Sequence, residues 1–323
     1  MKTLIKRELS FEDKIWLKKK GKTVQSFLVA LLKLIIMVGI AYIILGPVIS
    51  MLASSFFTKN DLYNPVVVLF PMEGTLDNYI TVYKTMAYPQ TLIRTVFYVG
   101  SLTFIQVIVC SMAGYGFARY DFPFKKLLFG CVILTIVLPS DTLMLPWYTE
   151  FRNFDILGIV SLIKGKPVNL LSTPVPMYIM TVLACGLRSG LYIYIFNQFF
   201  RGLPKEIEEA AVVDGAGPFY TYFRIMLVNA MPSVLTVSIF SMVWQYNDTF
   251  YSHLFAINSN ILMSLRISTV QATIAQALEI QDSAITQLYL YAGIILMLVP
   301  VVVIYCLLQK RFVEGVERSG IVG

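Results

Sequence analysis

Long apolar stretches alternate with short polar ones along this chain, and the apolar stretches have the length of membrane-spanning helices. Four of them contain no Lys, Arg, Asp or Glu: Leu34 to Thr58, Thr95 to Ala118, Val228 to Tyr246 and Ala284 to Gln309. Two others contain one charge each, Asp141 within 127–149 and Arg188 within 167–200. A helix needs about 20 residues to cross a bilayer. The pattern therefore predicts spans at 27–52, 92–118, 127–145, a fourth ending at Phe200, 231–250 and 286–308.

Composition supports an all-α integral membrane protein with about six transmembrane helices. Of the 323 residues, 57% are hydrophobic and 14% are charged, whereas a soluble domain has about a quarter charged residues. No stretch reads as a separate soluble domain. We expect a basic N-terminal segment at 1–26, a membrane domain at 27–308 and a C-terminal tail at 309–323.

The distribution of basic residues predicts the orientation. If the N-terminus is cytoplasmic, the inner segments 1–26, 119–126, 201–231 and 309–323 hold 17 Lys and Arg residues. The outer loops 59–94, 146–173 and 251–287 hold 7. Since basic residues favour the cytoplasmic side, both termini and the loop 201–231 are predicted to be cytoplasmic. The net charge of +7 reflects this bias and requires no nucleic-acid partner. Trp16 beside several lysines suggests contact with anionic membrane lipid.

Candidate catalytic and metal-binding chemistry is missing from the sequence. His253 is the only histidine, and the four cysteines lie within apolar stretches at spacings that suggest packing, not a metal site. Gly21-Lys22-Thr23 resembles the end of a phosphate-binding loop, but the position five before Gly21 is Trp16 where that motif requires glycine. We therefore expect no cofactor, no metal and no ATPase activity in this chain, which is predicted not to be an enzyme.

Polar residues near the ends of the spans allow two interpretations. Trp244, Gln245, Asn247 and Asp248 close the fifth span and could line a polar pathway in which aromatic faces stack on sugar rings. Alternatively they form an interfacial belt in which Asp248 makes local hydrogen bonds. Arg188 could contact substrate, although a structural pairing with Asp141 or Asp248 is favoured because charges within membranes usually have partners.

The segment Pro204 to Leu227 interrupts the apolar pattern with an organised polar one. Pro204 and three glutamates favour a helix N-terminus. Ile207, Ala210 and Ala211 share one helical face. Gly215 is typical of a helix C-terminus, and a second helix is expected over 219–227.

This segment resembles the EAA loop of membrane subunits in binding-protein-dependent ABC importers. The resemblance rests on Glu209-Ala210-Ala211, Gly215 and 225–227, and extends over roughly 75–323. The flanking sequences 196–206, 212–216 and 244–250 resemble the sugar-importer branch, particularly the smaller, G-type subunit of maltose-like importers. One departure is Val228, where relatives often have proline; here Pro232 comes four residues later.

The resemblance implies a type I ABC importer permease fold and a subunit that forms half of a carbohydrate pathway in a prokaryotic plasma membrane. The implied partners are a second, distinct permease forming a heterodimer, two ATP-binding subunits and an extracytoplasmic sugar-binding protein. The implied ATPase-coupling residues are Glu209, Ala210, Ala211, Asp214 and Gly215. Two alternatives remain open: an ABC permease for a non-sugar solute, and an ion-driven carrier that works alone.

Overall fold

The computed structural model describes residues 11–258 and 260–320, with side chains at 25–258 and 260–307. The expected basic segment 1–26 and tail 309–323 thus lie largely outside the described side chains. The chain divides into two units, Met1–Thr75 and Leu76–Gly323. In the first unit α1 (Phe11–Ser54) is followed by the short α2 (Lys59–Tyr63), which begins at a capping box made by Thr58 and Asp61. The apolar part of α1, Gln25–Ser54, contains the first predicted span.

The second unit is helical throughout its described residues, apart from loops and one isolated antiparallel bridge between Phe154 and Val168. Its longer helices are α3 (Asp77–Thr85), α4 (Tyr88–Arg119), α5 (Lys125–Val137), α6 (Met144–Arg152), α8 (Val175–Val182), α9 (Ser189–Gly202), α10 (Glu206–Val213), α13 (Met231–Tyr246), α15 (Met263–Ala277) and α16 (Ser283–Gly320). The shorter elements are η1 (Ser140–Leu143), η2 (Ile156–Gly158), α7 (Ile159–Lys164), α11 (Pro218–Tyr220), the π-helical η3 (Thr221–Met226), α12 (Leu227–Asn229) and α14 (Phe250–Leu254).

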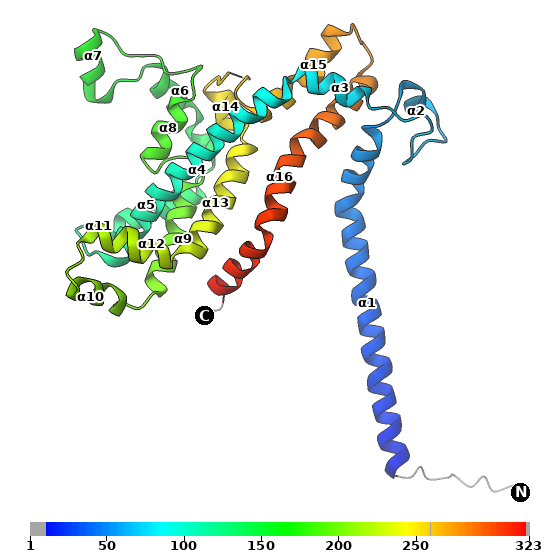
Figure 1. Cartoon of the computed structure of the whole chain (residues 1–323), viewed down its shortest axis with the longest axis horizontal. Helices are drawn as coiled ribbons and strands as arrows, with labels where there is room; N and C mark the ends of the chain where they lie inside the picture. Colours follow the sequence, from blue (N-terminus) through cyan, green and yellow to red (C-terminus); the bar gives the residue numbers. More distant parts are fainter. Residues whose placement is uncertain (1–10, 259, 321–323) are drawn as a thin grey trace, which may run out of the picture. The chain divides into compact units, whose positions relative to one another are not determined.

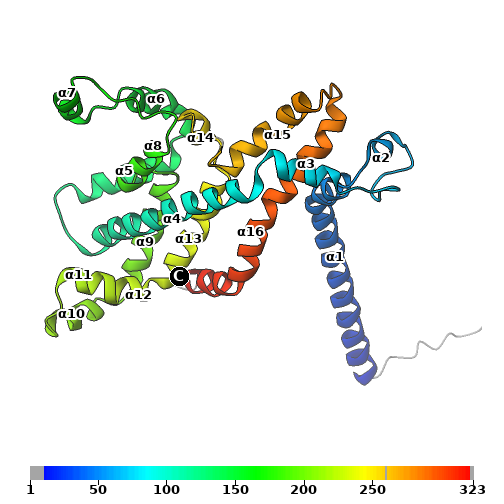
Figure 2. The same cartoon turned by 45° about the horizontal axis from the view of Figure 1, so that its top comes forward.

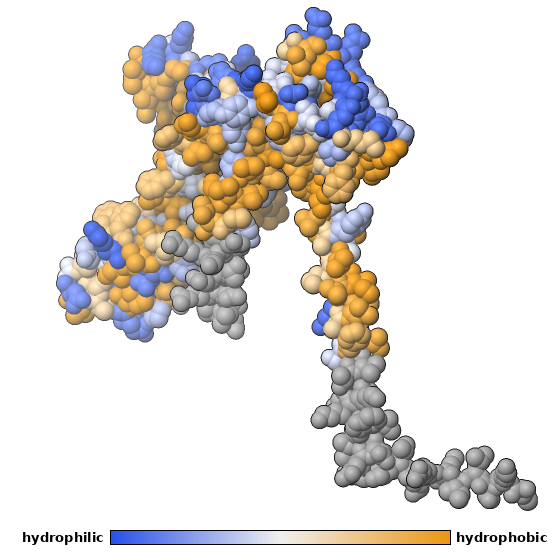
Figure 3. Space-filling model, turned by 45° about the vertical axis from the view of Figure 1, so that its right-hand side comes forward, coloured by the Kyte–Doolittle hydropathy of each residue, from blue (hydrophilic) through white to orange (hydrophobic). Residues whose placement is uncertain are grey.

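Within this unit, α10, α11 and α12 lie together at one end, and α6, α7, α14 and α15 lie at the opposite end (Figures 1 and 2). Helix α4 packs most extensively against α9, and α13 packs against both α4 and α16. Hydrophobic side chains cover the middle of the unit, while hydrophilic ones gather at its two ends (Figure 3). This distribution is that of a protein whose middle lies in a bilayer.

All six predicted spans overlap helices, but among the described residues only three helices are long and apolar enough to cross a membrane alone. These are Gln25–Ser54, α4 and Ser283–Leu307 in α16; the count among the described residues rises to five if two bent helix pairs each form one span. Helix α16 continues to Gly320, through most of the expected tail.

The predicted third and fourth spans are not continuous helices. After Val137 the chain turns by 107° into 140–152, because Pro139 has no N–H to continue the helix and disfavours helical geometry at Leu138. The fourth span is divided between α8 and α9, and 183–188 between them is not α-helical. Ala184 and Arg188 have positive φ angles of 58° and 60° there, a conformation that ends a right-handed helix.

The fifth span begins with a bend of 78° between 218–229 and α13. The bend falls at Ala230, two residues before Pro232, and Val228 remains inside the preceding helix. The displaced proline in the sequence therefore corresponds to a displaced break in the structure.

Candidate functional site

Helix α10 carries most of the predicted coupling residues and ends as the sequence predicts. Its first turn contains three glutamates, which stabilise the positive end of the helix dipole. Asp214 caps the helix and Gly215 follows with a φ of +81°. The Gly215 N–H donates to Val212 O at 3.0 Å and the Ala216 N–H to Ala211 O at 2.9 Å. This pair of bonds is a Schellman motif, which requires the left-handed residue that glycine supplies.

The five predicted coupling residues do not share one face. Glu209, Ala210, Asp214 and Gly215 are exposed, whereas Ala211 is buried inside the chain. Three large apolar side chains are exposed beside the first four: Val212, Val213 and Phe219, at 66%, 86% and 74%. We call these seven exposed residues the docking face. The exposure of these apolar residues was not predicted from the sequence. In a chain that is largely apolar, a valine or phenylalanine does not by itself indicate an exposed position.

The opposite side of loop 201–231 is anchored in a buried cluster formed by α4, α9, η3 and α13. Tyr222 and Met226 of η3 are buried in this cluster, and the Tyr222 hydroxyl lies 2.6 Å from the Ser111 hydroxyl of α4. The loop therefore has one face held by the membrane helices and another face free of them.

The five residues predicted to line a substrate pathway separate into exposed and buried groups. Arg188, Trp244 and Asn247 are exposed. The Arg188 guanidinium lies 4.4 Å from the Trp244 ring centroid, a cation–π contact. No described ion pair joins Arg188 to Asp141 or Asp248, so the favoured pairing with a carboxylate is wrong. Arg188 immediately precedes α9, after the break that follows α8. The prediction assumed one continuous helix and therefore placed this side chain incorrectly.

Gln245 and Asp248 are buried and have structural contacts. The Asp248 carboxylate accepts hydrogen bonds from the N–H groups of Tyr251 and Ser252 at 3.2 and 3.0 Å, and from the Ser252 hydroxyl at 2.7 Å. These are the local hydrogen bonds that the second interpretation of Asp248 predicts. The Gln245 amide donates to Gln106 Oε1 of α4 at 3.4 Å.

Gln106, which the sequence reasoning missed, joins three helices in a buried polar network. Its amide donates to Leu187 O at 2.7 Å and to the Ser189 hydroxyl at 3.0 Å, at the start of α9. Its Oε1 accepts from the Ser241 hydroxyl of α13 at 2.7 Å. Leu187 lies in the break between α8 and α9, so Gln106 satisfies a carbonyl that a continuous helix would have satisfied.

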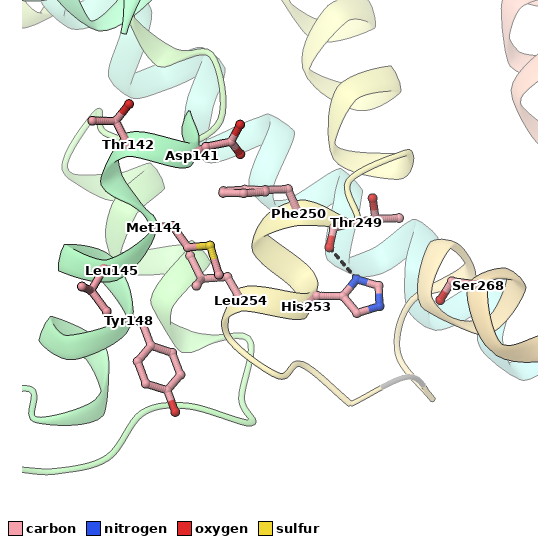
Figure 4. A pocket seen from close by; sticks show the side chains of 10 residues that line it. All are labelled: Asp141, Thr142, Met144, Leu145, Tyr148, Thr249, Phe250, His253, Leu254 and Ser268. Carbon is pink, nitrogen blue, oxygen red and sulfur yellow. Dashed lines mark hydrogen bonds between the residues drawn. The ribbon is translucent and has the colours of Figure 1, made fainter. Parts of the chain in front are cut away.

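An open cavity of about 950 Å³ is lined by residues of η1, α6, α14 and α15, at the end of the unit opposite α10 (Figure 1). Figure 4 shows the side chains that line it, among them Asp141, Met144 and Tyr148 of η1 and α6, and Phe250 and His253 of α14. His253 Nδ1 lies 2.7 Å from Thr249 O. The cavity is lined by none of the five predicted pathway residues. Its lining comes from three separate segments, 141–148, 249–254 and Ser268, which only the fold brings together.

No group of three or more His, Cys, Asp or Glu residues that could hold a metal is found among the described residues. The site is thus defined by two features, a docking face at one end of the membrane helices and an apolar cavity with a few polar groups at the other. Both features lie in a helical unit whose middle has an apolar surface (Figure 3).

Comparison with known proteins gives the family. Residues 106–318 match the family described as binding-protein-dependent transport system inner membrane component. The chain belongs to this family and is a multi-pass membrane protein.

Several relatives align over most of the chain. A probable ABC transporter permease protein of Pyrococcus horikoshii is 30% identical, over 86% of this chain and 92% of its own length. The permease SugB of a trehalose transport system in Mycobacterium tuberculosis is 27% identical, over 79% of this chain and 85% of its own length. The permease NgcG of a diacetylchitobiose uptake system in Streptomyces coelicolor is 24% identical, over 86% and 84%.

A solved structure supports the fold. A chain of a bacterial ABC transporter that imports the acidic polysaccharide alginate has a TM-score of 0.67 and 18% identity, with 94% of this chain and 99% of that chain covered. The predicted type I importer permease fold is confirmed.

Proposed function

We propose that this chain is the permease subunit of an ATP-driven ABC importer for an oligosaccharide in the plasma membrane of a prokaryote. It forms half of the translocation pathway with a second, distinct permease. Two ATP-binding subunits hydrolyse ATP on the cytoplasmic side, and an extracytoplasmic sugar-binding protein delivers the substrate. The outer loop 251–287, which contains α14 and α15, is the proposed contact for that binding protein.

The two-sided construction of loop 201–231 is the observation that carries this proposal. Its inner face is part of the buried cluster, whereas the docking face exposes Val213 and Phe219 at 86% and 74%. Exposed apolar patches flanked by polar residues usually mark protein–protein contacts. The loop is predicted to be cytoplasmic, where an ATP-hydrolysing partner is available. A carrier that works without a partner protein does not require an exposed apolar face for protein binding.

Carbohydrate is the proposed substrate class for two reasons. Two of the aligned relatives are named for uptake of trehalose and diacetylchitobiose. In the outer cavity, Tyr148 and Phe250 offer aromatic faces, and hydroxyl, imidazole and carboxyl groups lie around them. We propose that Arg188, Trp244 and Asn247 extend this surface along the pathway, while the buried Gln245 and Asp248 hold the backbone around it.

Transport follows alternating access. ATP binding closes the two ATP-binding subunits, the loop 201–231 moves with them, and the cavity between the permeases opens outward to accept sugar. Hydrolysis reverses the movement. In this scheme the ATP-binding subunit is contacted by Glu209, Ala210, Asp214 and Gly215. The small, buried side chain of Ala211 allows α10 to pack closely against the rest of the permease.

The substitution Gly215→Asp tests the proposed docking. A side chain at Gly215 meets no atom within 4 Å, but its φ of +81° disfavours every non-glycine residue. We expect the variant to reduce co-purification of the ATP-binding subunit and ATP-dependent uptake at least tenfold. Uptake is measured in proteoliposomes with a panel of radiolabelled trehalose, diacetylchitobiose and longer oligosaccharides.

Gly158→Asp is the matched control. Gly158 also has a φ of +81° and open space for a side chain, but lies in η2 at the opposite end of the unit. It is expected to retain complex formation and uptake within twofold. Unchanged co-purification and uptake in Gly215→Asp would refute the docking proposal, and transport of the sugars by this chain without ATP-binding subunits would favour the carrier.

A further inference from the structure

A partly buried ion pair connects the cytoplasmic end of α4 to helix α10. Arg119 is the last residue of α4, and its Nε lies 3.3 Å from Oε1 of Glu208 in α10. The Arg119 Nη2 also donates to Leu203 O, just after α9, at 2.8 Å. One side chain therefore joins α4, the end of α9 and α10.

Charge, not a directed hydrogen bond, holds this pair together. The side chains of Arg119 and Glu208 are only 6% and 20% exposed. Neither Arg119 Nε nor Glu208 Oε1 has a hydrogen-bond partner among the described residues. A neutral isostere of Glu208 therefore removes the attraction and leaves the guanidinium charge without its carboxylate, a large penalty for a buried pair.

Adjacent glutamates of α10 point in different directions. Glu209 is exposed on the docking face, while Glu208 contacts Arg119 of α4. A second link joins the loop to the same helix, the 2.6 Å contact between the Tyr222 and Ser111 hydroxyls. Ser111 and Arg119 lie eight residues apart on α4, or about 12 Å along the axis. Two separated attachments fix both the position and the orientation of the loop relative to α4.

Helix α4 leads from this attachment to the substrate end of the molecule. Gln106, five residues before Ser111, is hydrogen-bonded to the start of α9 and to α13. Arg188 immediately precedes α9, and α13 contains Trp244; these two residues form the cation–π contact. A continuous set of contacts thus leads from α10 to the proposed pathway.

We propose that Arg119 and Glu208 are positioning residues that transmit movement of α10 to α4, separately from the residues that bind the ATP-binding subunit. This inference rests on the proposed function and assigns the two steps of coupling to opposite faces of one helix. Glu209 on the docking face serves attachment, and Glu208 on the inner face serves transmission.

The test compares Glu208→Gln with Glu209→Gln in the assembled importer in proteoliposomes. Three quantities are measured: the amount of co-purified ATP-binding subunit, the rate of ATP hydrolysis, and the labelling rate of the reporter Asn247→Cys with and without ATP and vanadate. Asn247 is exposed near the outer end of α13, and the native cysteines are replaced by serine.

Glu208→Gln is expected to retain the ATP-binding subunit within twofold and to hydrolyse ATP. The ATP-dependent change in labelling rate at residue 247 is expected to fall at least tenfold. Glu209→Gln is expected to lose co-purification instead. Arg119→Lys keeps the positive charge and is expected to retain a measurable ATP-dependent change in labelling rate at residue 247. The double variant Arg119→Met with Glu208→Met removes both buried charges at similar volume, so it is expected to fold, assemble and remain uncoupled.

A full ATP-dependent response in Glu208→Gln or in the double methionine variant would overturn the proposal. Loss of the ATP-binding subunit from Glu208→Gln would also overturn it, because the pair would then only shape the docking face. If Glu209→Gln and Gly215→Asp both leave assembly intact, the docking proposal fails, whereas the labelling result for Glu208→Gln can still be interpreted by itself.

Discussion

Asp61 shows how a single carboxylate can organise a loop. It is 2% exposed and accepts hydrogen bonds from the N–H groups of Met72, Glu73 and Gly74 at 2.9, 3.3 and 3.3 Å. The Thr58 N–H and hydroxyl donate to it at 3.2 and 3.1 Å. Burial raises the pKa of this carboxyl, but the backbone hydrogen bonds from Thr58 and 72–74 outweigh burial and lower the pKa from 3.8 to about 2.

This depressed pKa gives the loop 58–74 a defined pH dependence. Because the folded-state pKa lies below the ordinary value, the stabilisation is fully present above pH 3.8 and is lost as the pH falls toward about 2. We expect amide hydrogen-exchange protection at Met72, Glu73 and Gly74 to decrease across that interval. Asp61→Asn, a neutral isostere, is expected to show low protection at every pH, and a wild-type loop with constant protection from pH 5 to 2 would contradict the assignment.

At the same scale, the sequence identified several important residues but not their partners. Asp248 and Arg188 were recognisable because charges near spans are costly. Their contacts were not predictable: the carboxylate caps the start of α14, and the guanidinium lies against Trp244. Gln106 gave no signal, since one glutamine in an apolar helix does not reveal which carbonyl lies opposite.

Helices α4 and α9 approach each other closely at Gly114. A Cβ atom there would lie 2.6 Å from Phe196 Cβ, 2.9 Å from Asn197 N and 3.0 Å from Ile193 O. Small residues commonly permit such approaches between membrane helices. Since two of these neighbours are backbone atoms of α9, the helices must separate to admit a methyl group.

Gly114→Ala is therefore expected to destabilise the protein by about 1–3 kcal/mol, the usual cost of overpacking. Gly116→Ala on the same helix is the control, because a Cβ there meets nothing within 4 Å and alanine favours a helix by about 0.5–1 kcal/mol. The midpoint of thermal aggregation in detergent, followed by size-exclusion chromatography, is expected to fall for the first variant only. Equal midpoints would refute the close approach.

Element by element, the sequence predicted where apolar helices occur better than where they bend. α4 and α13 correspond well to the predicted spans. The bend after Val137 and the break between α8 and α9 depend on how neighbouring helices satisfy the freed backbone groups, which a hydropathy pattern does not contain. Loop 201–231 was predictable because the Glu-rich start and Gly215 are local signals of a helix and its end.

For the whole molecule, the predicted orientation places loop 201–231 inside the cell and α7 outside. Leu157→Cys and Lys126→Cys test it in intact cells, in a chain whose native cysteines are replaced by serine. Both positions are exposed, Leu157 at 94%. We expect a membrane-impermeant maleimide to label residue 157 directly and residue 126 only after permeabilisation. The reverse pattern would place both termini outside.

The π-helical turn Thr221–Met226 within the coupling loop has a consequence for evolution of the chain's length. A π turn holds one residue more than the α-helix that would replace it. Deleting one residue here lets the turn relax to an α-helix, and the register of everything downstream is kept. A deletion inside α13 would instead rotate the following residues by about 100°. The loop can thus lose one residue during evolution while its two ends still contact the same neighbours.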